Sequence, residues 1–168
     1  TPADVQQRLV RYQNGTPVAG AWLFDATVLL AEKAPTGVDL AYGTSNKGDW
    51  DATLASFLGA PGNAGDRGQA DAAISANASR TSTSGTPLGV PATKQQIIIT
   101  VPWLSTASRT FGVVGGVSRN PAKPADADAI VADYVDQVAK RFAEKGFSNL
   151  ALWGVYFMRE ETVPSDVA

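Results

Sequence analysis

The chain of 168 residues contains no histidine and no cysteine. Imidazole and thiolate are the usual general bases, nucleophiles and transition-metal ligands of proteins, so a Ser-His-Asp triad, a cysteine protease and an ordinary zinc site are excluded. Asp, Glu, Lys and Tyr remain as groups that can transfer protons. Any catalysis must therefore rest mostly on carboxylates, and we expect no cofactor.

Basic charge is also scarce, with 14 Lys and Arg against 16 Asp and Glu and a net charge of −2. Such a balance offers no basic face for phosphates, so nucleic-acid binding is not expected. The longest apolar runs, residues 22–30 and 150–158, are too short to span a bilayer. The lack of cysteine leaves the compartment open. Richness in Ala, Thr, Ser and Gly favours an exported protein, located outside the cell or on its surface.

The apolar pattern predicts alternating strands and helices. Ile130, Tyr134, Val138 and Phe142 recur every four residues, acidic side chains precede them, and Gly146 can cap the end, so residues 125–145 form the clearest helix. We expect further helices over 49–58 and 67–78, a loop over 79–93, and buried strands over 22–30, 96–101 and 150–157.

This alternation predicts one α/β domain over residues 1–168, with parallel strands joined by crossover helices. The strands are apolar on both faces, so we expect both faces of the sheet to be covered and the 125–145 helix to pack across it. Two architectures fit. One is a small open α/β sheet, which the length favours, and the other is part of a (β/α)8 barrel, which needs about 250 residues when complete.

Functional residues of parallel sheets gather where the strands end. Glu160 and Glu161 follow the 150–157 strand, Asp25 interrupts the first strand, and Trp103 leaves the 96–101 strand. Aromatic planes beside carboxylates suit a sugar ring, whose C–H faces stack and whose glycosidic oxygen needs a proton. Trp22 and Tyr156 could also hold the sugar.

Each candidate has an ordinary structural alternative. Glu160 and Glu161 can be a solvated pair that follows a strand, and Asp25 can be a core carboxylate bonded to main-chain N–H groups. Trp103 and Tyr156 can simply pack in a core. Arg119, which follows a Gly-Gly turn, can be a surface residue or a substrate clamp.

Five stretches resemble a bacterial family known as domain of unknown function 4855. They are residues 22–25, Asp49-Trp50, 98–102, Phe111-Gly112 and, most specifically, 149–161. The resemblance implies a glycosidase-like (β/α)8 barrel of which this chain is the amino-terminal half. In related barrels a Glu that ends the fourth strand is the acid/base, and the nucleophile ends the seventh strand, for which this chain has no counterpart. Val155 and Phe157 depart from the family's Phe and Trp.

The resemblance implies a glycoside hydrolase-like protein that acts on extracellular polysaccharide or oligosaccharide through carboxylate acid/base chemistry. Strand alternation through Tyr156 and Met158 gives Glu160 the inward parity and makes it the acid/base, with Glu161 and Asp25 shaping its proton affinity. The alternative is a noncatalytic carbohydrate-binding or cell-surface module. Half a barrel would leave strand edges uncovered, so a second chain or a missing second half would have to complete it.

Overall fold

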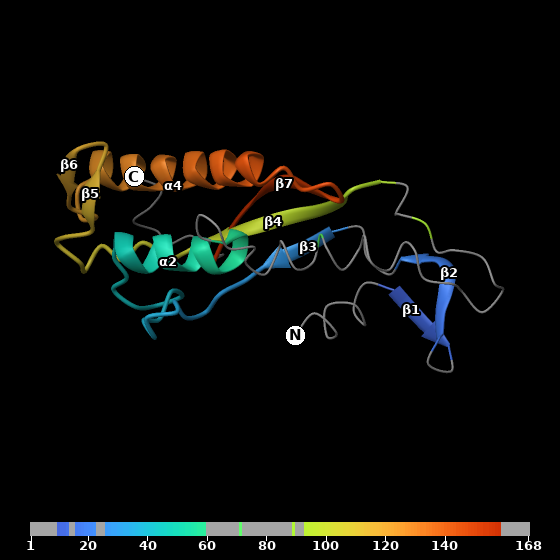
Figure 1. Ribbon diagram of the computed structural model, residues 1–168. Helices are drawn as coiled ribbons and strands as arrows, with labels where there is room; N and C mark the ends of the chain where they lie inside the picture. The colour runs from blue at the N-terminus through green and yellow to red at the C-terminus, as the bar shows by residue number, and fades with distance from the viewer. Residues whose placement is uncertain are drawn as a thin grey trace.

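The computed structural model describes residues 10–13, 16–22, 26–59, 71, 89 and 93–158. Its central feature is a three-stranded parallel sheet in the order β3-β4-β7, formed by β3 (Ala26–Leu29), β4 (Gln95–Val101) and β7 (Leu150–Phe157) (Figure 1). The parallel strands and crossover helices confirm the predicted α/β class. The sheet is open and does not close into a barrel, as the chain length had favoured.

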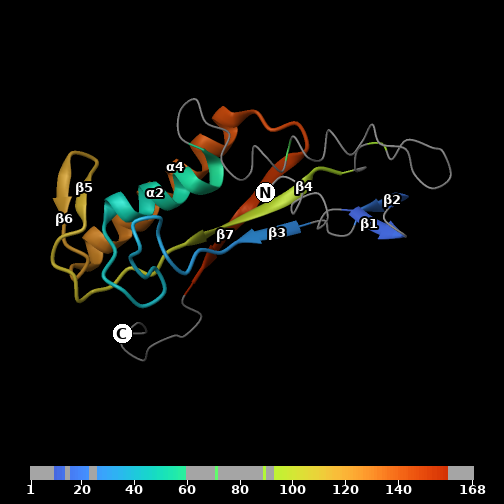
Figure 2. The ribbon, with the colours of Figure 1, turned by 60° about the horizontal axis from the view of Figure 1, so that its bottom comes forward.

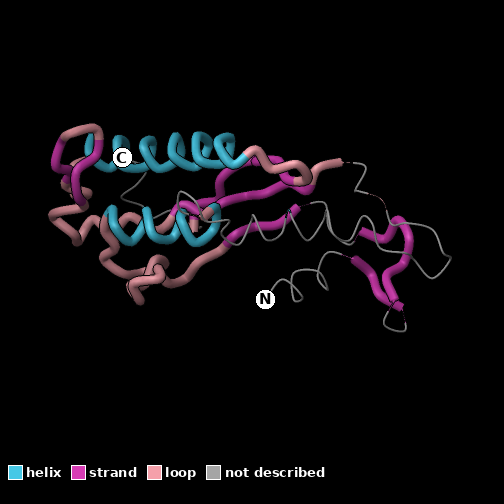
Figure 3. Tube along the Cα trace, in the orientation of Figure 1, coloured by secondary structure: helices cyan, strands magenta, loops and turns pink. Residues whose placement is uncertain are grey.

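Two helices lie against this sheet, α2 (Lys47–Leu58) and α4 (Pro124–Lys145). Figure 2 shows both on the same side of it, and Figure 3 shows them running side by side. The predicted stripe of α4 is buried, since Ile130, Tyr134, Val138 and Phe142 are all 8% exposed or less. The helix predicted over 67–78 lies outside the described residues apart from Asp71.

The core fills the space between the helices and one face of the sheet. Ile97, Ile99 and Val101 point into it from β4, and Trp50 of α2 packs edge-on against Phe111 and Tyr134. The Tyr134 hydroxyl donates to the Thr100 carbonyl oxygen at 3.1 Å, which ties α4 to the central strand. Burial raises the pKa of this phenol far above its usual range, so it stays protonated and keeps donating.

The prediction that both faces of the sheet are covered is wrong, because the face opposite the helices, called here the open face, carries exposed apolar side chains. Val28 and Trp153 are 47% and 66% exposed, and Ile98 between them is half-buried. Trp153 stands at a bulge in β7, where Ile97 pairs with Leu152 but Ile98 pairs with Gly154. Among the described residues the helices therefore cover one face of the parallel sheet, and the apolar character of the strands gave no sign of which face that would be.

The strand predicted over 22–30 is wrong in its extent. Trp22 ends β2 (Thr16–Trp22), which pairs antiparallel with β1 (Val10–Gln13) in a separate sheet, whereas β3 begins at Ala26. A second antiparallel hairpin joins β5 (Gly112–Val114) to β6 (Val117–Arg119). Its turn residues Gly115 and Gly116 both have positive φ, which a two-residue hairpin turn of this kind requires.

A candidate glycan site at the carboxyl edge of the sheet

The three parallel strands end at one edge of the sheet, called here the carboxyl edge. Leu29 pairs with Ile99, and Val101 pairs with Phe157, so their carboxyl ends lie together. The loops after β3 (residues 30–46) and after β4 (residues 102–111) both start there, and hairpin β5–β6 lies at the same end of the molecule (Figure 1). The structure thus provides the kind of edge where parallel sheets carry their sites.

Trp103 leaves β4 at this edge, as predicted, and the loop after β3 holds its main chain on both sides. The Trp103 N–H donates to the Leu40 carbonyl oxygen at 2.8 Å, and the Ser45 hydroxyl donates to the Trp103 carbonyl oxygen at 3.5 Å. Ser45 in turn accepts a 2.8 Å hydrogen bond from the indole N–H of the buried Trp50. The side chain of Trp103 is half-buried, so it contacts the protein and still reaches solvent.

Tyr156 lies one residue before the end of β7, opposite Thr100, and is half-buried. The following strand end is fixed by the N–H of Met158, which donates to the Val101 carbonyl oxygen at 3.2 Å. Trp103 and Tyr156 therefore come from neighbouring strands at the same edge, and their predicted role in holding a sugar stays a prediction.

Arg119 is half-buried at the end of β6 and pairs with Asp126 at 2.9 Å. Its Nε also donates to the Val114 carbonyl oxygen at 3.4 Å, so the side chain fastens hairpin β5–β6 to the first turn of α4. The guanidinium hydrogen bond, with a second bond from the Asn120 N–H, lowers the pKa of the Asp126 carboxyl. This arrangement gives Arg119 a structural partner, while its predicted role as a substrate clamp stays a prediction.

The three predicted acids, Glu160, Glu161 and Asp25, lie outside the described residues. Trp22 is described only in its backbone, as the end of β2, and so belongs to the β1–β2 sheet instead of the parallel one. The structure therefore does not place Trp22 on a strand that ends at the carboxyl edge.

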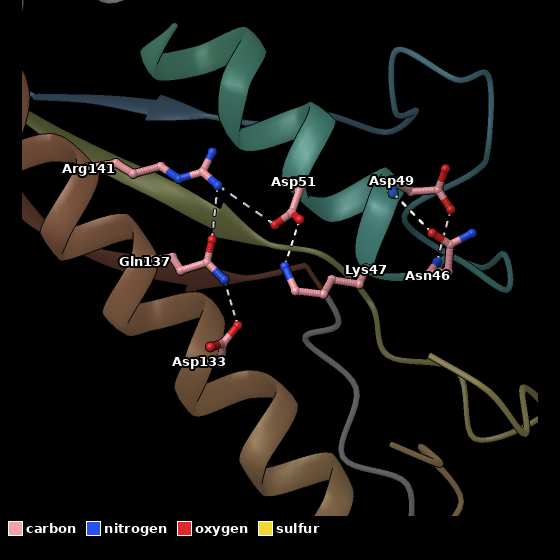
Figure 4. Close-up of polar contacts among 7 residues, drawn as sticks. All are labelled: Asn46, Lys47, Asp49, Asp51, Asp133, Gln137 and Arg141. Atoms are coloured by element: carbon pink, nitrogen blue, oxygen red, sulfur yellow. Dashed lines mark hydrogen bonds and ion pairs between the residues drawn. The ribbon is translucent and has the colours of Figure 1, made fainter. Parts of the chain in front are cut away.

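The carboxylates near the start of α2 serve the fold (Figure 4). Asp49 is 4% exposed, closes a capping box with Asn46, and accepts a 2.6 Å hydrogen bond from Thr36. Asp51 pairs with Lys47 at 2.6 Å and faces Arg141 of α4 at 3.9 Å. These groups stabilise the helix start and the contact between helices, and none of them is placed as a proton donor to a substrate.

Sequence reasoning overlooked Tyr42, which lies between the two residues that hold Trp103. Its side chain is 89% exposed. Its N–H and that of Ala41 each donate to one Asp39 carboxylate oxygen at 2.8 Å, and these bonds, that of Tyr42 first, lower the pKa of Asp39. An Asp three residues before a Tyr and four before a Gly was the available signal, since Asp side chains commonly bond to the N–H groups that follow them in turns.

Within the described part of the chain, no group of three acidic side chains is placed to hold a metal ion. Neither described helix combines the length and apolar character needed to cross a membrane.

Comparison with known proteins returned a family model over nearly the whole chain. Residues 3–168 match the model described as Domain of unknown function (DUF4855). No curated protein and no solved structure matches the chain. The match agrees with the resemblance carried by the end of β7 and by the start of α2. The chain belongs to this family of domains of unknown function.

Proposed function

We propose that this chain is a glycoside hydrolase-like protein that acts on extracellular polysaccharide at the carboxyl edge of its parallel sheet. One observation carries the proposal, the hydrogen bond between the Met158 N–H and the Val101 carbonyl oxygen. Trp103 follows Val101 by two residues, and Glu160 follows Met158 by two residues. In sequence, an aromatic residue thus follows one of these two hydrogen-bonded strand ends by two positions, and an acid follows the other by two positions.

The proposed chemistry follows from these residue types. Trp103 stacks on the C–H face of a sugar ring, and Tyr156 helps to hold it. Glu160 donates a proton to the glycosidic oxygen as the bond from that oxygen to the anomeric carbon breaks, and a water molecule adds to the anomeric carbon and releases a proton to solvent. Glu161 and Asp25 keep the proton on Glu160 near neutral pH through like-charge repulsion. The absence of histidine and cysteine supports carboxylate chemistry as the route.

A noncatalytic carbohydrate-binding or cell-surface module is the second candidate. It is favoured by four of the described carboxylates, since Asp39, Asp49, Asp51 and Asp126 hold structural partners. The proposed catalysis needs the three predicted acids, whereas binding through Trp103 does not.

The test is release of reducing ends from a panel of plant, fungal and bacterial polysaccharides, with binding measured in parallel. Glu160→Gln should abolish hydrolysis and preserve folding and binding, and Glu161→Gln should cost less. Glu144→Gln, an exposed position on α4, serves as the control. Binding without hydrolysis by the unmodified chain would establish the noncatalytic module instead. Near-normal turnover by Glu160→Gln would remove this residue from the mechanism, and the absence of both binding and hydrolysis would contradict the proposal.

A further inference from the structure

Tyr42 is an aromatic residue held out into solvent at the carboxyl edge. With 89% of its surface exposed it contributes almost nothing to the core, in contrast to Leu40, two residues earlier, which is fully buried. A large exposed ring beside a candidate site is free to contact a ligand through its face.

The loop around Tyr42 is fixed on both sides. Asp39 accepts the N–H groups of Ala41 and Tyr42, and a Cβ at Gly43 would collide with the Asp39 carbonyl oxygen, so the chain turns tightly there. The buried side chain of Leu40 anchors the same turn. Because the backbone is already ordered, a ligand that stacks on the ring has only side-chain freedom to restrict.

The loop that carries Tyr42 is hydrogen-bonded to the main chain of Trp103. The Leu40 carbonyl oxygen accepts the N–H of Trp103, and the Ser45 hydroxyl donates to the Trp103 carbonyl oxygen. Tyr42 stands between Leu40 and Ser45 in the sequence. Two aromatic residues are therefore carried by hydrogen-bonded loops at the carboxyl edge.

We infer that Tyr42 is a sugar-stacking residue that extends the glycan site beyond Trp103, so that the protein binds a chain of several sugar units in preference to a single one. This inference rests on the proposed function. Stacking on the apolar face of a pyranose depends on the aromatic ring and not on the hydroxyl, so Tyr42→Phe should keep the affinity for the sugar chain.

The experiment is isothermal titration of the 168-residue protein with neutral hexasaccharides of the cello-, xylo-, chito- and galacto- series, and with the matching disaccharides. Tyr42→Ala should weaken hexasaccharide binding by about 2- to 12-fold. It should leave the weaker disaccharide binding nearly unchanged, and Tyr42→Phe should bind like the unmodified protein. Trp153→Ala is the matched control, because Trp153 is also an exposed aromatic but belongs to the middle of β7.

The outcomes separate the two claims. Unchanged hexasaccharide affinity in Tyr42→Ala, with affinity lost in Trp103→Ala, would overturn the inference and leave the proposed function standing. Loss in Tyr42→Ala that Tyr42→Phe does not restore would also overturn it. If none of the oligosaccharides binds the unmodified protein, the inference and the proposed function fail together. The exposure of Tyr42 means that its two variants should fold. Circular dichroism and the melting temperature verify folding for them and for Trp103→Ala.

Discussion

Asp39 shows how one side chain can order a loop. Its carboxylate accepts two main-chain hydrogen bonds, and these favour the charged form, so its pKa falls below the ordinary value of 3.8. A lowered pKa in the folded state means that the stabilisation is present above the ordinary value and is lost as the pH falls through the folded value.

We predict that the carboxyl resonance of Asp39 titrates with a midpoint below 3.8 and that the Tyr42 amide keeps its chemical shift until that pH is reached. The measurement is NMR of the ¹³C carboxyl and ¹⁵N amide signals during acid titration. Asp39→Asn, which removes the charge, should abolish the pH-dependent shift of the Tyr42 amide. A midpoint at or above 3.8 would mean that these hydrogen bonds do not form in solution.

Ser45 offers a second prediction for a single residue. Its hydroxyl accepts the buried indole N–H of Trp50, which is 1% exposed, and Ser45→Ala would leave that donor without a partner. We expect the free energy of unfolding to drop by about 1–3 kcal/mol, measured by urea denaturation. Ser105→Ala, in the same edge but only half-buried, should change it by less than about 0.5 kcal/mol. Equal effects of both substitutions would contradict the role assigned to Ser45.

Helix α4 was predictable from the sequence almost to the residue, because one amphipathic stripe, its terminal charges and Gly146 all indicate the same helix. Strand β4 was predictable for a similar reason, since four β-branched aliphatic residues and a threonine precede Pro102. Local patterns of this strength do not depend on distant partners.

The error over residues 22–30 has a physical cause. An apolar run looks alike whether it forms one strand or the ends of two. Here β2 pairs with β1 and β3 pairs with β4, and these two partner strands are far from each other in sequence. The Asn14-Gly15 pair, a strong signal for a two-residue hairpin, stands between β1 and β2. It indicates a strand that starts at Thr16, and Trp22 belongs to that strand. The hydrogen bonds of Leu40 and Ser45 to Trp103 join two loops, and no local sequence pattern reveals such contacts.

The importance of the stripe on α4 can be measured. Ile130 is 1% exposed, so Ile130→Ala should lower the free energy of unfolding by about 2–5 kcal/mol, and Ile130→Val by about 0.5–1.5 kcal/mol. Thermal and urea unfolding followed by circular dichroism gives both values. A loss below about 1 kcal/mol for Ile130→Ala would mean that α4 does not pack on the sheet as described.

The parallel sheet of this chain differs from a closed barrel in having two edge strands and an open face. Val28 and Trp153 are exposed there, while Ile99 on the other face is fully buried. The expected second chain or second half stays a prediction, and analytical ultracentrifugation of the 168-residue protein measures whether it associates with itself.

The two faces should differ in their response to substitution. Trp153→Ser should change the free energy of unfolding by less than about 0.5 kcal/mol, since the side chain is 66% exposed. Ile99→Ala, on the covered face, should cost about 2–5 kcal/mol. A large loss of stability in Trp153→Ser would show that the open face is covered in solution, by this chain or by a second copy.

An NMR titration of the ¹⁵N-labelled chain with the neutral hexasaccharides can locate glycan binding at the carboxyl edge of the parallel sheet. We expect amide shifts concentrated in residues 39–45 and 102–111, the two loops joined at Trp103. Shifts confined to the open face around Val28 and Trp153, or to hairpin β1–β2, would contradict this expectation, as would a spectrum that no oligosaccharide of the panel changes.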